Sequence, residues 1–151
     1  EMLYWDKDDK NLGAKLPPGC GPLGAMALAD AIKNNGALVT VNMMGNKIGK
    51  GQLSKLQEMM QVHPTLVSLC GIADDATEAN LSGLGMDADD AVVLADELPA
   101  KGALAKITFS GDKYNSKPVT IESSMTEADF SGKFLQASGA IMLAAFLPKC
   151  R

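Results

Sequence analysis

The sequence has few of the residue types that usually build an active site. Its 151 residues include one histidine, one tryptophan and three cysteines, and aromatic residues make up 5% of the chain. A Ser-His-Asp or Cys-His arrangement would have to use His63. This histidine stands just before Pro64, where a predicted helix ends, which favours a role at the helix C-terminus. The sequence therefore indicates a protein that is not an enzyme.

Cysteine and acidic patterns that would hold a metal are also lacking. Cys20, Cys70 and Cys150 lie far apart and form no CxxC pair. An odd count without metal-ligand spacing indicates free thiols in a reducing compartment, and a single Cys20–Cys150 bridge is the alternative. The acidic cluster over residues 87–90 precedes a predicted helix, where carboxylates cap free N–H groups. We expect no metal and no other cofactor.

An excess of basic residues and a long apolar run are both missing. Lys plus Arg number 14 against 18 Asp plus Glu, a net charge of −4, which argues against nucleic-acid binding. The longest apolar run is eight residues, 140–147. A membrane span needs about 20 residues. No charged-then-apolar signal segment opens the chain. We expect an intracellular protein of the cytoplasm or of an organelle such as the chloroplast, not a secreted one.

The informative feature that is present is an internal repeat. Residues 77–99 and 126–148 align without a gap, and 11 of the 23 positions are identical. Residues 25–38 match residues 91–104 less closely, with shared alanine, leucine, aspartate and glycine positions. Self-similarity of this kind is typical of repeat architectures, which mostly build surfaces rather than active sites.

Each repeat is predicted to contain a helix and a short strand. Apolar residues at helical spacing over 26–32 form one stripe, and Gly36 is suited to end that helix. Inward residues at a spacing of two then mark a strand. The step from Leu38 to the corresponding Leu66 is 28 residues.

The first strand carries a recognisable motif. Leu38, Val41, Met43, Asn46 and Ile48 stand at the spacing L-x-x-L-x-L-x-x-N-x-L. This pattern resembles that of the leucine-rich repeat family, in the long-repeat form typified by ribonuclease inhibitor, and the chain is similar to short repeat proteins of algae and other protists. The later repeats are degenerate. The resemblance implies an α/β fold, a short leucine-rich repeat solenoid whose parallel curved sheet carries helices on its outer face.

The predicted organisation is an N-terminal arm or cap over residues 1–20 and a leucine-rich repeat domain over residues 21–151. Helices are predicted over 23–34, 51–61, 88–98 and 137–147. Strands are predicted over 39–43, 66–70, 78–81, 104–109 and 127–130, with a small hairpin excursion that includes 119–122. Helical crossovers make the repeating strands parallel, so one sheet face should meet the helices and the other should be open.

The open face is predicted to be polar and without aromatic side chains. It consists of the outward neighbours of buried strand residues, namely Thr40, Asn42, Ser68, Cys70, Asn80, Ser82, Lys106, Thr108, Asp129 and Ser131. Such a face suits hydrogen bonding to a partner, and a merely solvated face is the alternative. Tyr4, Trp5 and Tyr114 are candidate aromatic anchors. For Tyr4 and Trp5, capping of the first repeat is the alternative.

The resemblance implies a non-catalytic protein–protein interaction module, because leucine-rich repeats commonly present a concave sheet to protein partners. We expect a structural or peripheral subunit of a larger assembly, with an organellar assembly such as a photosynthetic complex among the candidates. A transient regulatory binder is one alternative. An enzyme or small-ligand protein is another, and it would need polar groups such as Cys70, Lys106 and Asp129 to converge in a pocket.

Overall fold

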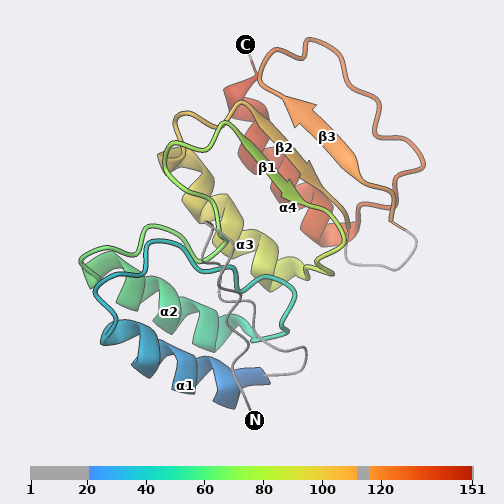
Figure 1. Ribbon diagram of the computed structural model, residues 1–151. Coiled ribbons are helices and arrows are strands. Elements are labelled where there is room, and N and C mark those ends of the chain that lie inside the picture. The colour runs from blue at the N-terminus through green and yellow to red at the C-terminus, as the bar shows by residue number, and fades with distance from the viewer. Residues whose placement is uncertain (1–20, 112–115, 151) are drawn as a thin grey trace. The chain divides into compact units, whose positions relative to one another are not determined.

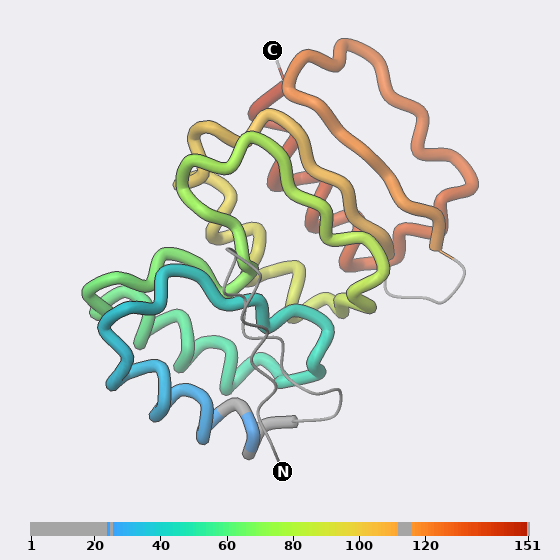
Figure 2. The backbone as a smooth tube through the Cα atoms, in the orientation of Figure 1, coloured from blue at the N-terminus to red at the C-terminus, as the bar shows by residue number. Residues whose placement is uncertain are grey.

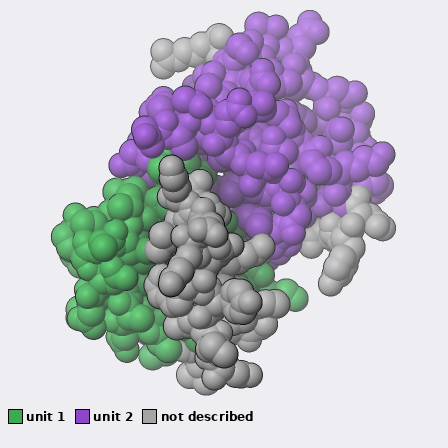
Figure 3. Space-filling model, viewed as in Figure 1, with its two compact units in different colours: residues 1–73 green, residues 74–151 purple. Residues whose placement is uncertain are grey.

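A computed structural model describes residues 21–111 and 116–150 of the chain. The chain divides into two compact units, Glu1–Ala73 and Asp74–Arg151, which Figure 3 shows in different colours. The predicted arm over residues 1–20 lies outside the described residues. The candidate anchors Tyr4, Trp5 and Tyr114 lie outside them as well.

The first unit contains two helices joined by irregular chain. Helix α1 spans Gly21–Lys33 and helix α2 spans Lys50–Val62 (Figure 1), so both predicted helices are confirmed. The two predicted strands are present only as isolated bridges. Thr40 pairs in parallel with Ser68, and Asn42 pairs in antiparallel fashion with Cys70.

Asn46 and Gly49 shape the turn that leads into α2. The side-chain Nδ2 of Asn46 donates to Met43 O at 3.0 Å, a hydrogen bond to the backbone of the turn. Gly49 precedes α2 with a φ of +84°, a conformation that glycine adopts without steric cost. Leu53 and Leu56 then bury the inner face of the helix.

His63 ends α2 and ties this end to α1. Its Nδ1 accepts hydrogen bonds from Thr65 N at 3.3 Å and Leu66 N at 3.0 Å. Because Nδ1 accepts, Nε2 carries the proton, and it donates to Ile32 O at 3.0 Å. His63 therefore serves as a structural link within the first unit.

The second unit is a three-stranded mixed sheet with two helices on one side. Strand order is β1 (Glu78–Leu81), β2 (Lys106–Phe109), β3 (Val119–Glu122), and β1 is parallel to β2. Helices α3 (Ala88–Glu97) and α4 (Gln136–Phe146) pack against each other and are followed by the 3-10 turns Leu98–Ala100 and Leu147–Lys149. The two helices lie on the same side of the strands in Figure 1. The buried strand residues are Leu81, Ile107, Phe109, Val119 and Ile121.

Asp87 starts α3 with a reciprocal cap. Its side chain accepts from Asp90 N at 3.0 Å, while the Asp90 carboxylate accepts from Asp87 N at 3.2 Å. Both bonds satisfy N–H groups that a helix leaves free at its first turn. The prediction that this acidic cluster caps the helix is confirmed.

The fold is not the predicted solenoid. β3 runs antiparallel to β2, so the sheet is mixed rather than parallel. The hairpin return at 119–122 is confirmed as β3, whereas the predicted strand over 127–130 does not form. β3 already occupies the edge of β2 that residues 127–130 would need in a parallel stack. In Figure 2 the chain after β3 instead returns toward α4 as a separate stretch.

Candidate functional site

The side of the second unit's sheet away from the helices is polar. Two rows of residues cross it in register: Glu78, Lys106 and Glu122 in one, and Asn80, Thr108 and Thr120 in the other. On β2 and β3 these positions alternate with buried apolar residues, as expected where one sheet face is buried and the other solvated. We call these six residues the polar sheet face.

The groups of the polar sheet face bond across the strands. Lys106 Nζ lies 3.2 Å from Glu78 Oε2, and the Thr108 and Thr120 hydroxyl oxygens lie 2.9 Å apart. The Glu78 side chain is 67% exposed. Exposed cross-strand pairs contribute about 0.2–1 kcal/mol each. Their main consequence is therefore to order the side chains of this face and to neutralise part of its charge.

A shallow pocket lies at one end of this face. Its volume is about 360 Å³, and it is lined by Thr77, Glu78, Ala105, Lys106, Glu122, Ser123 and Ser124. Two carboxylates, one ammonium group and three hydroxyls are gathered there. The side chains lining it include neither histidine nor cysteine, so the pocket offers hydrogen bonds and charge to a polar ligand but no strong nucleophile.

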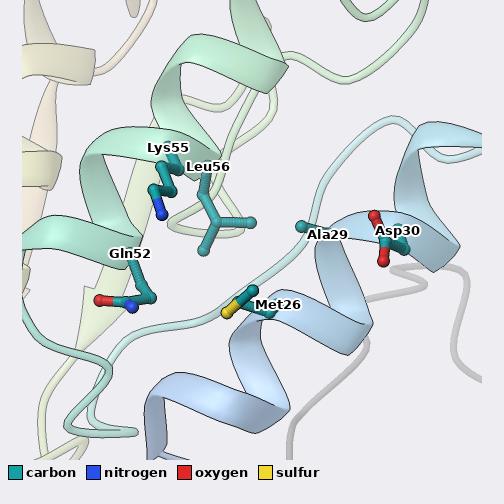
Figure 4. A pocket seen from close by; sticks show the side chains of 6 residues that line it. All are labelled: Met26, Ala29, Asp30, Gln52, Lys55 and Leu56. Carbon is teal, nitrogen blue, oxygen red and sulfur yellow. The ribbon is translucent and has the colours of Figure 1, made fainter.

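A second pocket lies in the first unit, between α1 and α2. It has a volume of about 170 Å³ and is lined by Met26, Ala29, Asp30, Gln52, Lys55 and Leu56 (Figure 4). Met26 of α1 and Leu56 of α2 extend into the space between the helices. The lining is mainly apolar, and it gives no converging set of polar groups.

Two residues predicted for the open face are buried instead. Ser68 is 0% exposed and Cys70 is 1% exposed. The Ser68 hydroxyl oxygen accepts hydrogen bonds from Cys70 N at 3.0 Å and Ile72 N at 3.1 Å, which satisfies it in the interior. The placement of these two residues on an open face is therefore corrected. Cys70 and Cys150 are both free thiols.

The remaining predicted residues fall in three places. Lys106 and Thr108 lie on the polar sheet face, while Thr40 and Asn42 are half-buried in the first unit. Asp129 lies in the unpaired segment after β3 and Ser131 in the turn that follows it, and both are exposed. Within the second unit, the lining of the polar pocket includes Lys106 but not Asp129.

Asp129 is held by a local turn. Ser131 N donates to Asp129 Oδ1 at 2.8 Å. This hydrogen bond, together with one from the Ser131 side chain and the nearby charge of Lys133, lowers the pKa of Asp129 below its ordinary value of 3.8. The carboxylate therefore stays charged and turned to its own backbone.

Phe134 is a residue that the sequence reasoning missed. It is 61% exposed and adopts a left-handed φ of +54°. In the internal repeat it aligns with Gly85, whose φ is +66°. The alignment of the two repeat copies could have identified it, because Phe134 stands where the first copy has a glycine in a left-handed conformation. An exposed aromatic is thus kept in a conformation that disfavours it.

Replacing Phe134 with glycine tests this strain. Because glycine takes the left-handed conformation without a Cβ clash, Phe134→Gly should be more stable than Phe134→Ala by about 1 kcal/mol. Urea unfolding of the two variants measures the difference, and alanine is the matched control because it also removes the ring but keeps the Cβ. Equal stabilities would contradict a strained backbone at this position.

Comparisons with known proteins give no relative. No protein-family model matches the chain, and no curated protein or solved structure is significantly similar to it. None of the helices in the described parts of the chain has both the length and the apolar character needed to cross a bilayer. Over residues 21–111 and 116–150, no three His, Cys, Asp or Glu side chains lie together in a way that could hold a metal ion.

Proposed function

We propose that the protein is a non-catalytic protein–protein interaction module that acts as a structural or peripheral subunit of a larger assembly. The polar sheet face is the contact surface. Support comes from one observation above all: the sheet presents two ordered rows of polar side chains, and the described helices of the second unit lie on its other side.

The arrangement of the polar groups favours a broad partner over a small molecule. Glu78 forms an ion pair with Lys106, and Thr108 forms a hydrogen bond with Thr120. These groups therefore pair with neighbours across the strands and do not all point toward one ligand position. Hydroxyl and carboxylate groups at a flat surface retain free lone pairs for further hydrogen bonds. A partner surface that matches two rows uses many such groups at once, as protein interfaces do.

The polar pocket favours the alternative of a small polar ligand. It gathers the hydroxyls of Ser123 and Ser124 beside Lys106, which suits a ligand with a carboxylate or phosphate group. The carboxylates of Glu78 and Glu122 line the same pocket and oppose an anion. The pocket thus carries mixed charge, and we rank a small-ligand role below partner binding.

An arginine at the centre of the polar sheet face tests the proposal. Thr108→Arg should weaken partner binding by about 2 kcal/mol, roughly 30-fold, because it inserts a long charged side chain into a matched surface. The measurement is recovery of the partner with a tagged chain from the source organism, read by native mass spectrometry. Val92→Arg is the matched control, since Val92 is 44% exposed on α3 rather than on the sheet.

Two results would count against this proposal. If native mass spectrometry of the protein from its source organism finds only the monomer, the subunit role is contradicted. If the Thr108→Arg variant is folded, as its amide NMR spectrum would show, and still recovers the partner as well as the native chain does, the contact does not lie on the polar sheet face. Recovery lost equally in Val92→Arg also removes the argument for that face.

A further inference from the structure

The two copies of the internal repeat differ in one structural respect. Residues 78–81 of the first copy form β1, whereas the aligned residues 127–130 of the second copy form no strand. We propose that residues 127–130 are a docking site for an extended strand of a partner protein, paired in parallel as β2 pairs with β1. This contact is additional to the polar sheet face and does not require that face to be occupied.

Both copies end this segment with the same turn. In the first copy Ser82 N donates to Asn80 Oδ1 at 3.0 Å, and in the second Ser131 N donates to Asp129 Oδ1 at 2.8 Å. The glycine that follows is left-handed in both, with φ of +74° at position 83 and +63° at position 132. The second copy therefore keeps the geometry that ends β1, although it has no neighbouring strand.

The backbone of the second segment is unpaired. In the first copy, Thr77 O accepts from Ala105 N at 2.8 Å and from Lys106 N at 3.1 Å, which starts the parallel ladder. Among the described residues, no backbone hydrogen bond joins residues 126–129 to another segment, and all four are exposed. Exposed backbone with unpaired N–H and C=O groups can pair with an added strand.

Apolar residues of the second copy lack the cover that the first copy has. Leu81 is 4% exposed, whereas its counterpart Phe130 is half-buried. Leu98 is 0% exposed, whereas its counterpart Leu147 is 45% exposed. A partner that adds a strand at 127–130 would also cover apolar surface at Phe130, and burial of such surface contributes about 25 cal/mol per Å².

The chemistry of the partner strand follows from β2. Lys106 pairs with Glu78, and Thr108 lies opposite Asn80. Glu127 and Asp129 hold the corresponding positions, so the partner strand should present a basic residue and then a hydroxyl or second basic residue to them. The partner strand should also carry apolar residues, as β2 carries Ile107 and Phe109, at the positions that lie beside Ala128 and Phe130.

A peptide with the sequence of residues 103–110, ALAKITFS, is the probe. Titrated into the full ¹⁵N-labelled chain, it should shift the amide signals of residues 126–131. N-methylation at Lys106 and Thr108 should weaken binding at least tenfold, because these N–H groups face a parallel partner, as Lys106 N faces Thr77 O. Methylation at Ile107 and Phe109, the matched control, should leave binding unchanged because their N–H groups point to the opposite edge.

A charge exchange locates the site without disturbing the fold. Glu127 is exposed, so Glu127→Lys should fold normally and bind the peptide several-fold more weakly. A peptide with Lys106→Glu should recover binding to this variant. Shifts confined to residues 78–81 or 119–122, equal loss from both methylation patterns, or no shift at millimolar peptide would overturn the proposal.

The outcome is separate from that of the polar sheet face. The peptide titration uses the purified chain, whereas the Thr108→Arg test uses the natural partner. Peptide binding at 126–131 with unchanged partner recovery in Thr108→Arg supports strand docking and rejects the polar sheet face. If the peptide does not bind and Thr108→Arg weakens partner recovery, strand docking is rejected and the polar sheet face is supported.

Discussion

Phe109→Ala should lower the free energy of unfolding of the second unit by about 3–5 kcal/mol. Phe109 is fully buried and stands between Leu81 of β1 and Val119 of β3 in the inner row of the sheet. Truncation removes the ring from a row that three strands share, and it leaves a cavity that neither neighbour is long enough to fill. Chemical denaturation followed by far-ultraviolet circular dichroism measures the loss.

Phe109→Leu provides the comparison for this prediction. It keeps an apolar side chain in the same row, so the loss should be about 1.5 kcal/mol or less, well below that of alanine. Two variants of equal and near-native stability would show that the inner row of the sheet is not a packed core. The position of the polar sheet face, which is the opposite side of the same strands, would then lose its basis.

Gly111→Ala is expected to produce the second large effect, a loss of about 3 kcal/mol. A Cβ at this position would lie 2.6 Å from Leu135 O and 2.7 Å from Phe134 O. Both contacts are with backbone oxygens of the segment that leads into α4, and backbone cannot rotate away as a side chain can. The substitution must therefore displace either the end of β2 or the start of α4.

Gly102→Ala is the matched control in the same unit. A Cβ at Gly102 would meet no atom within 4 Å, so alanine there should leave stability unchanged or raise it by about 0.5 kcal/mol through the unfolded chain. Thermal unfolding of the two variants gives the comparison. A Gly111→Ala variant as stable as Gly102→Ala would contradict the close approach of the chain before α4 to residue 111.

The prediction was also wrong about the burial of two residues, Ser68 and Cys70. Alternation placed Ser68 and Cys70 on an open face because Leu69 between them is buried, and Leu69 is indeed fully buried. Strict alternation requires a regular strand, however, and this stretch is only bridged at two positions. The Ser68 side chain instead points inward and accepts hydrogen bonds from two backbone N–H groups. The alternation of apolar and polar residues in the sequence does not predict this.

Local signals in the sequence were sufficient for the helices, for β1 and β3, and for the caps. The signals used were the helical spacing of apolar residues and the acidic cluster before α3. Both act within a few residues, so they can be read from the chain alone. The internal repeat likewise located equivalent elements, including α3 and α4.

Which strands pair was decided only in three dimensions. Residues 78–81 and 127–130 hold equivalent positions in the internal repeat and share their first two residues, Glu-Ala, yet one segment is a strand and the other is not. The reason is that β3 folds back and takes the edge of β2 that the second copy would need. Strand pairing depends on which distant segment covers a free sheet edge, and local residue spacing does not determine this. The sequence by itself therefore determined the helices and the positions of β1 and β3, and the tertiary structure determined the mixed sheet, its polar face and which predicted strands stayed unpaired.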